Sequence, residues 1–465
     1  MYIGSKGFTI PKTLLKDNEL TTIRNDLMIK TSNSYQQSGS TFPVYRESTN
    51  KIYVPRFYGI QKYGFVSNDL SPGMDIDVPF QGSLREIQQP IVDAFLNCAK
   101  TKGCGLVELP CGFGKTIIAL YLVHSLRKKT LVIVHKEFLL EQWKERIQEF
   151  LPDAKIGRIQ GTIIDVNGKD IVIGMLQSLS MKDYPKQLFD SFGFTIIDET
   201  HHIAAEVFSN ALFKIVTPYM LGLSATMNRK DGLTKVFQLF LGDIEYKVVR
   251  EKTNNVIVNA IYYKTNDLEF NETILNHKGQ SDYSKMLSKI TSYLPRTLFI
   301  IEVLKNLLSD PLNQQIMILA QYKHVLNQIY SYVEEHQLDT VGYYIGGMKQ
   351  TDLKSSETKK IILATYAMAE EALDIKTLTT LMMITPKTNV TQSVGRILRS
   401  NHERPFIVDI IDKHDVFHKQ WYLRKKFYNQ NNYTIMYSNN VNYPIMEKEK
   451  EKVKKCNLDL SKFIS

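Results

Sequence analysis

A chain of 465 residues, of which 43% are hydrophobic and 23% charged, has the balance of a globular protein with two or three domains. Its net charge of +10 favours a polyanionic partner such as nucleic acid, because each phosphate that a cation neutralises releases a counterion. No apolar run approaches the ~20 residues of a membrane-spanning helix, which argues against a membrane protein. The N-terminus lacks a signal-peptide layout, and the 4 cysteines form no Cys-x-x-Cys pair. These features argue against a secreted disulfide scaffold and a zinc module.

The first predicted elements lie in residues 1–80, where serine, asparagine and glycine are mixed with aromatic residues. The segments Phe42–Tyr45 and Lys51–Val54 are strand-like, and the turn-forming Ser48–Asn50 separates them, as in a β-hairpin. The break at Ser71–Gly73 ends this region. We therefore expect a small β-containing accessory domain at the N-terminus.

From about residue 84, short apolar runs alternate with amphipathic stretches, which predicts an α/β fold with two blocks, residues 81–245 and 297–430, each built on a parallel sheet. The expected strands are Leu131–Val134, Ile171–Ile173, Phe194–Ile197, Met220–Leu223, Ile316–Ala320, Thr340–Tyr344, Ile361–Ala364, Leu381–Ile384 and Phe406–Ile410. Expected helices of the first block are Ile117–Leu126, Phe138–Phe150 and Glu206–Ile215.

The segments outside these blocks have a different composition. Residues 246–296 begin with the strand-like Val256–Tyr263 and then become polar, so we expect a linker. Residues 431–465 contain the charge run Glu447–Lys455, and we expect a basic C-terminal tail whose charged residues face solvent.

The sharpest motif is the run Leu-Pro-Cys-Gly-Phe-Gly-Lys-Thr at residues 109–116, between a strand-like and a helix-like segment. A phosphate chain needs bare backbone N–H groups, a helix N-terminus and a cation. Gly112 and Gly114 allow the loop to curl around phosphates, Lys115 can reach the β- and γ-phosphates, and the Thr116 hydroxyl can ligate Mg²⁺. Leucine replaces the motif's first glycine, and Gly-x-Gly-Lys-Thr alone also occurs in ordinary turns.

An acidic pair, Asp198-Glu199, follows the strand-like Phe194–Ile197. A carboxylate at the tip of a buried strand beside a phosphate loop can bind Mg²⁺, and its neighbour can orient and deprotonate an attacking water. Such a pair alone is also typical of a helix N-cap. Gln88, upstream of the loop, can bind adenine through its amide, or it is an ordinary surface residue.

Four motifs, residues 109–116, Asp198–His201, Leu223–Thr226 and Gln392–Arg399, resemble in this order the helicase motifs of superfamily 2. The resemblance extends over about residues 84–412. It implies two tandem RecA-like lobes that close over ATP and Mg²⁺.

Further segments indicate which group within superfamily 2 the sequence resembles. Asn228–Leu233, and the pairing of Leu84-Arg85 with Gln88, are similar to the XPB-type group. Val54–Tyr58 and Val408–Asp412 resemble members from large DNA viruses, among them the poxvirus transcript-release helicases. This resemblance implies viral transcription or DNA repair as the setting, the transcription machinery as a partner, and the host cytoplasm or virion as the location.

The resemblance also assigns roles to single residues. The nucleotide-binding residues it implies are Arg85, Gln88, Pro110, Cys111, Gly112, Phe113, Gly114, Lys115 and Thr116. The residues it implies for coupling the nucleotide state to the strand are Ser224, Ala225, Thr226 and Asp374. Gln392 would contact the nucleotide or the water, and Arg396 and Arg399 are candidate arginine fingers, with Arg399 preferred. Ala372 stands where glycine is usual, which leaves less backbone freedom there.

A motor must grip phosphate and sugar rather than bases, because it steps over any sequence. The candidate nucleic-acid contacts are Lys136, Gln177, Gln321, Gly346 and Thr365. Trp143 is a further candidate, but its amphipathic spacing favours core packing.

We therefore expect an ATP-dependent helicase or translocase that acts on DNA or RNA, soluble, intracellular and monomeric. One alternative is a double-stranded DNA translocase that does not separate strands, since both activities use the same motor. A non-catalytic nucleic-acid-binding scaffold is a second alternative. A kinase-type phosphate-loop enzyme is disfavoured, because it has no use for a second lobe with residues 392–399.

Overall fold

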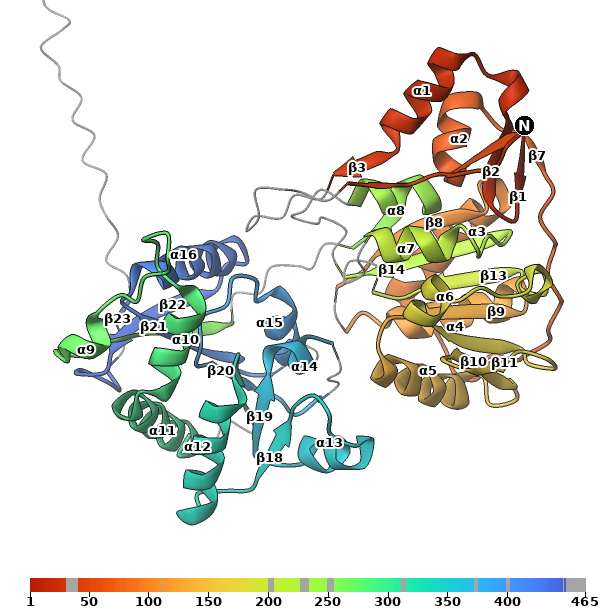
Figure 1. The fold of residues 1–465 in the computed structure, drawn as a ribbon. Helices are drawn as coiled ribbons and strands as arrows, with labels where there is room; N and C mark the ends of the chain where they lie inside the picture. Colours follow the sequence, from red (N-terminus) through yellow and green to blue (C-terminus); the bar gives the residue numbers. More distant parts are fainter. Residues whose placement is uncertain are drawn as a thin grey trace, which may run out of the picture. The chain divides into compact units, whose positions relative to one another are not determined.

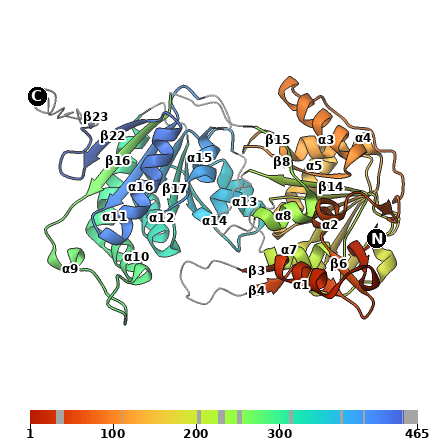
Figure 2. The same cartoon turned by 90° about the horizontal axis from the view of Figure 1, so that it is seen from above.

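The computed structural model describes residues 1–30, 41–110, 112–199, 205–225, 234–248, 255–310, 315–371, 375–398, 402–445 and 447–448. The chain divides into two compact units, Met1–Arg250 and Glu251–Ser465. Each unit is described by itself, and Figures 1 and 2 show the elements of both.

The N-terminal part of the first unit is a small five-stranded sheet in the order β5-β6-β2-β1-β7, with a separate pair β3-β4. The strands are β1 (Tyr2–Gly4), β2 (Gly7–Pro11), β3 (Met28–Lys30), β4 (Thr41–Pro43), β5 (Arg46–Glu47), β6 (Lys51–Val54) and β7 (Ser67–Asn68), and the helices are α1 (Asp17–Asp26) and α2 (Arg56–Tyr63). The expected hairpin exists, but its first strand is β5 rather than Phe42–Tyr45. The turn bond from Ser48 N to Lys51 O sets Glu47 opposite Ile52, so the earlier residues are free to pair with β3.

The rest of the first unit is an eight-stranded sheet in the order β11-β10-β12-β9-β13-β14-β8-β15. Its strands are β8 (Cys104–Glu108), β9 (Thr130–Val134), β10 (Ile156–Gln160), β11 (Ile163–Asp165), β12 (Ile171–Met175), β13 (Phe194–Ile197), β14 (Tyr219–Ser224) and β15 (Ile244–Lys247). Only the β10–β11 pairing is antiparallel among these strands. The central strands are buried along their whole length, as expected of a parallel sheet covered on both faces.

Helices cover this sheet on both sides (Figure 1). They are α3 (Gln89–Thr101), α4 (Lys115–Leu126), α5 (Glu137–Phe150), α6 (Leu176–Met181), α7 (Ala205–Leu212) and α8 (Thr234–Leu241). Phe95, Ile118 and Trp143, from α3, α4 and α5, share one apolar core. Leu176 and Phe208, from α6 and α7, belong to a second core on the opposite face.

The second unit contains another eight-stranded sheet, in the order β18-β19-β17-β20-β21-β16-β22-β23. Its strands are β16 (Ile257–Tyr263), β17 (Ile316–Ala320), β18 (Val341–Tyr344), β19 (Ile361–Thr365), β20 (Thr380–Met383), β21 (Phe406–Asp412), β22 (Thr434–Asn439) and β23 (Glu447–Lys448). Its helices are α9 (Leu268–Asn271), α10 (Tyr283–Ser292), α11 (Leu294–Leu308), α12 (Lys323–Glu335), α13 (Gln350–Glu357), α14 (Tyr366–Glu371), α15 (Thr391–Ile397) and α16 (Asp415–Gln430). All its pairings are parallel except β22–β23. The expected fold class, two tandem RecA-like parallel-sheet units with a small N-terminal β-containing part, is confirmed.

The structure differs from the expectation for residues 246–296 and 431–465. β16 lies inside the second sheet, where it pairs with β21 and β22, and α10 buries Met286 and Ile290 in the second unit's core. Residues 257–296 are therefore part of the second unit rather than a linker. The strand β22 begins within the expected tail, because its backbone completes the ladder of β16.

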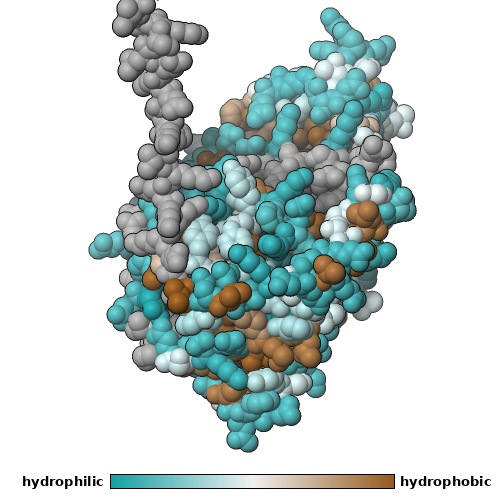
Figure 3. Space-filling model, turned by 90° about the vertical axis from the view of Figure 1, so that its left-hand side faces the viewer, coloured by the Kyte–Doolittle hydropathy of each residue, from teal (hydrophilic) through white to brown (hydrophobic). Residues whose placement is uncertain are grey.

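Hydrophilic side chains surround smaller hydrophobic groups on the face drawn in Figure 3. Within the described ranges, every helix is too short or too polar to span a bilayer.

Candidate nucleotide-binding site and second-unit motifs

The phosphate-loop motif lies where the buried strand β8 gives way to α4. Gly112 and Gly114 have φ values of 80° and 88°, the left-handed region that favours glycine. A Cβ on Gly114 would also collide with the Gln88 amide. Lys115 and Thr116 begin α4, so the free N–H groups of that helix end face the loop, which is a site suited to anions. Cys111 lies outside the described residues.

The structure brings Gln88 and Arg85 to this loop. Gln88 is 1% exposed, and its Nε2 donates to Phe113 O at 2.9 Å while its Oε1 accepts from Arg85 N at 3.0 Å. Arg85 also donates to Phe113 O, at 2.6 Å, and its guanidinium lies over the Phe113 ring. Both side chains thus hold the loop in shape, and an adenine contact of Gln88 stays a prediction.

The acidic pair lies at the end of β13, which runs between β9 and β14 in the middle of the sheet. Lys115 Nζ and Glu199 Oε1 are 2.5 Å apart in a largely buried ion pair. Glu199 has a φ of 50°, an uncommon conformation for a residue with a side chain. The strand order therefore places the cation of α4 directly against Glu199, at the end of β13.

Asp198 is 6% exposed, and its surroundings disfavour its charge. Burial, followed by the neighbouring Glu199 carboxylate, raises the pKa of Asp198 to about 6, although Lys115 and a hydrogen bond from Trp143 act in the opposite direction. A cation beside this carboxyl group would favour its ionised form.

Trp143 is a residue of this site whose role the sequence did not reveal. Its expected core position is correct, since it is 1% exposed among the apolar residues under α5. Its indole Nε1 also donates to Asp198 Oδ2 at 2.8 Å. A buried indole N–H needs a hydrogen-bond acceptor, and this requirement was the one feature of the sequence that could have indicated a polar partner for Trp143.

The motif at residues 223–226 lies next to the phosphate loop. Ser224 ends β14, is fully buried, and pairs with Glu108 at the end of β8. Ser224 O accepts a hydrogen bond from Leu109 N at 2.9 Å, which ties this strand end to the loop, and Ala225 follows it. Thr226, the third coupling residue of this motif, lies outside the described residues.

In the second unit, Gln392 and Arg396 lie on α15. Arg396 is 4% exposed, and its Nε donates to Ala369 O of α14 at 2.8 Å. This packing fits a structural role for Arg396 at least as well as a catalytic one. Asp374, Ala372 and Arg399 lie outside the described residues.

The expected nucleic-acid contacts lie at or just after the carboxyl ends of strands. In the first unit, Lys136 caps α5 after β9, and Gln177 lies in α6 after β12. In the second unit, Thr365 ends β19 and Gln321 follows β17, while Gly346 O accepts a bond from Lys323 Nζ at 3.2 Å. Their contact with a strand stays a prediction.

Comparisons with known proteins agree with these motifs. The family described as "Type III restriction enzyme, res subunit" matches residues 81–229. The chain is 34% identical to L396 of Acanthamoeba polyphaga mimivirus, named as an ATP-dependent RNA helicase, over 98% of this chain and 91% of that protein. It is 26% identical to QP509L of African swine fever virus, named in the same way, over 71% of this chain and 69% of that protein. It is 32% identical to the DNA 3′–5′ translocase XPB2 of Sulfurisphaera tokodaii, over 45% of each chain.

Proposed function

Because the chain belongs to the superfamily 2 helicases, related to those of large DNA viruses and to XPB-like translocases, we propose that it converts ATP hydrolysis into movement along a nucleic-acid strand. That membership makes the chain an ATP-dependent helicase and hence an ATPase. The observation that carries the proposal is the meeting of Lys115, Glu199 and Asp198 at the N-terminus of α4.

The proposed hydrolysis begins with an exchange of partners. In the structure the Lys115 ammonium and the Glu199 carboxylate neutralise each other. A γ-phosphate at the start of α4 competes for Lys115, because it carries more negative charge and also meets the helix N-terminus. Glu199 is then released to orient the attacking water and accept its proton.

We propose that Thr116 and Asp198 hold Mg²⁺ together with the phosphates. Buried Asp198, whose pKa is raised to about 6, fits a cation, since the cation would offset the cost of its ionised form. When bound, Mg²⁺ neutralises charge on the β- and γ-phosphate oxygens.

Trp143→Phe is expected to raise the Mg²⁺ concentration for half-maximal ATP hydrolysis by about 10-fold or more, because hydrogen-bond partners of metal-binding groups tune metal affinity on this scale. Phenylalanine keeps most of the buried volume but removes the donor to Asp198 Oδ2. The measurement is an ATPase titration with Mg²⁺, accompanied by thermal unfolding. The chain's other tryptophan, Trp421, is buried in the second unit, and Trp421→Phe should keep the original Mg²⁺ dependence. An unchanged titration for Trp143→Phe would show that the bond does not tune the carboxyl group.

Net charge and the placement of polar residues support the binding of nucleic acid. The net charge of +10 favours a polyanion, and Lys136, Gln177, Gln321 and Thr365 follow strand ends, where open α/β sheets bind ligands. Contacts of this kind read backbone rather than sequence. We propose transcript release or DNA repair as the biological setting, on kinship alone.

A second candidate function is translocation along double-stranded DNA without strand separation, which the name of XPB2 favours. Strand displacement and triplex displacement, measured side by side with ATP, separate the two. Displacement of both substrates supports a helicase, and displacement of the triplex strand alone supports a translocase. Displacement of neither, with ATP hydrolysis intact, contradicts movement along the strand.

A further inference from the structure

Residues 384–387 follow β20 and lead toward α15, and buried side chains donate hydrogen bonds to their backbone carbonyls. Arg296 NH2 donates to Ile384 O at 2.8 Å, and Arg424 NH1 donates to Lys387 O at 2.6 Å. Between them, Tyr366 Oη donates to Thr385 O at 2.8 Å. Pro386 occupies the remaining position. We refer to residues 384–387 as the α15 approach segment.

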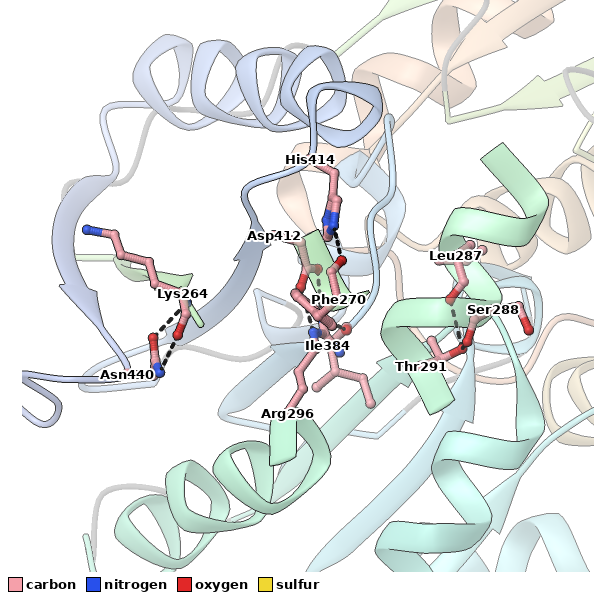
Figure 4. Close-up of polar contacts among 10 residues, drawn as sticks. All are labelled: Lys264, Phe270, Leu287, Ser288, Thr291, Arg296, Ile384, Asp412, His414 and Asn440. Carbon is pink, nitrogen blue, oxygen red and sulfur yellow. Dashed lines mark hydrogen bonds and ion pairs between the residues drawn. The ribbon is translucent and has the colours of Figure 1, made fainter. Parts of the chain in front are cut away.

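The two arginines are held in turn by carboxylates of β21. Arg296 binds Asp412 through Nε at 2.6 Å and NH2 at 2.8 Å (Figure 4). Arg424 binds Asp409 through Nε at 2.7 Å and NH2 at 2.9 Å. The side chains of the first pair are 0% exposed, and those of the second are 3% and 1% exposed. Both pairs use the planar fork of the guanidinium. Arg296 reaches the α15 approach segment with the second N–H of the NH2 that also binds Asp412, and Arg424 reaches it with NH1.

The two pairs lie on opposite faces of the second sheet. Neighbouring residues of a strand alternate between faces, so Asp409 and Asp412, three positions apart, point in opposite directions. Arg296 comes from α11 and Arg424 from α16. Donors from both sides of the sheet therefore converge on the same short segment.

Stability alone does not explain this arrangement. Burying an ion pair costs desolvation that the attraction often fails to offset, and apolar replacements of similar volume are frequently neutral or stabilising. These two arginines also donate directly to the backbone at Ile384 O and Lys387 O, directional bonds that an apolar side chain in their place would not make. The position defined here is that of the chain leading into α15, whose N-terminal part carries Gln392 and whose end carries Arg396.

We propose that Asp409 and Asp412 are positioning residues for ATP hydrolysis, acting through Arg424 and Arg296 on the α15 approach segment and so on the arginines of the 392–399 motif. This inference rests on the proposed roles of that motif. Displacement of the segment moves α15 and misplaces its catalytic groups, while the nucleotide contacts of the first unit are unchanged. The expected signature is a lower kcat with little change in the KM for ATP.

Arg424→Lys is the sharpest variant. Lysine keeps a charge beside Asp409, but its single nitrogen has no planar fork and cannot reproduce the bonds that Nε, NH2 and NH1 of Arg424 make in three fixed directions. We expect kcat to fall between about 10- and 100-fold, the range for small misplacements of catalytic groups, with the KM for ATP within about 3-fold. Tyr366→Phe, which removes only the bond to Thr385 O, provides a second and gentler variant should Arg424→Lys unfold. Arg24→Lys, which alters the fork of Arg24 on Glu47 in the first unit, is the matched control and should keep wild-type kcat.

A double-mutant cycle with Arg399→Ala completes the test, with ATP hydrolysis, nucleotide affinity and thermal unfolding measured for each variant. If the segment acts through the motif arginine, Arg424→Lys should cost little further kcat in the Arg399→Ala background. Full additivity of the two losses, or an unchanged kcat for Arg424→Lys and Tyr366→Phe, overturns the inference. If Arg399→Ala alone keeps wild-type kcat, the proposed finger role of Arg399 fails instead, so the two failures are distinguishable.

Discussion

Lys115→Ala is expected to abolish ATP turnover while nucleic-acid binding remains measurable. Lys115 begins α4, and its Nζ lies 2.5 Å from Glu199 Oε1, so alanine removes the cation that the β- and γ-phosphates require. Loss of a single preorganised group that stabilises developing charge costs about 10²–10³-fold in rate, and the expected loss here is at least that large. Alanine also removes the Lys115 charge that neutralises the Glu199 carboxylate, and the remaining negative charge repels the phosphates of ATP.

Two assays check this expectation: steady-state ATP hydrolysis, and fluorescence anisotropy with labelled single strands. Lys128→Ala is a suitable control, because Lys128 pairs with the exposed Asp75 in the same unit and lies outside the phosphate loop. The control should hydrolyse ATP like the wild type. Retained turnover in Lys115→Ala would contradict the assignment of the nucleotide site.

Arg399→Ala is expected to lower kcat by about 10³-fold or more, with ATP affinity close to that of the wild type, because an arginine finger acts on charge that develops on the γ-phosphate. Arg396→Ala should behave differently. Arg396 is 4% exposed and its Nε bonds to Ala369 O, so its removal leaves a buried carbonyl without this donor. We expect a lower unfolding temperature for Arg396→Ala, together with reduced activity.

The comparison requires kcat, nucleotide affinity and thermal unfolding for both variants under identical conditions. A lower kcat in Arg399→Ala without loss of thermal stability supports a finger at that position. An unchanged kcat in Arg399→Ala, with a severe loss in Arg396→Ala and a normal unfolding temperature, would move the finger to Arg396.

Much of the fold could be predicted from local sequence. The buried runs that form β13 and β17 have the same bounds in the structure as in the sequence pattern, because a strand covered on both faces must be continuously apolar. The error at residues 246–296 has a nonlocal cause. β16 is completed by β21 and β22, which come much later in the chain, and the polar residues that follow β16 resemble a linker in any local window.

The residue types of the candidate site could be predicted from the motifs, but the hydrogen bonds among their side chains could not. The motifs predicted an acidic pair beside the phosphate loop, and in the structure Glu199 contacts Lys115. They did not predict that these two side chains would form an ion pair. The bond from Trp143 to Asp198 depends on how α5 packs against β9 and β12, which periodicity does not specify. Gln88 was predicted to bind adenine, and in the structure its amide bonds to Phe113 O and Arg85 N.

ATP hydrolysis by this chain is expected to be coupled to nucleic acid. The most direct test measures the ATPase rate alone and with single-stranded DNA, double-stranded DNA, single-stranded RNA and double-stranded RNA, using Lys115→Ala as the blank. We expect a severalfold rise in kcat with at least one of these polymers, and this rise should weaken with added salt because phosphate contacts release counterions. Hydrolysis that none of the four polymers stimulates would contradict it.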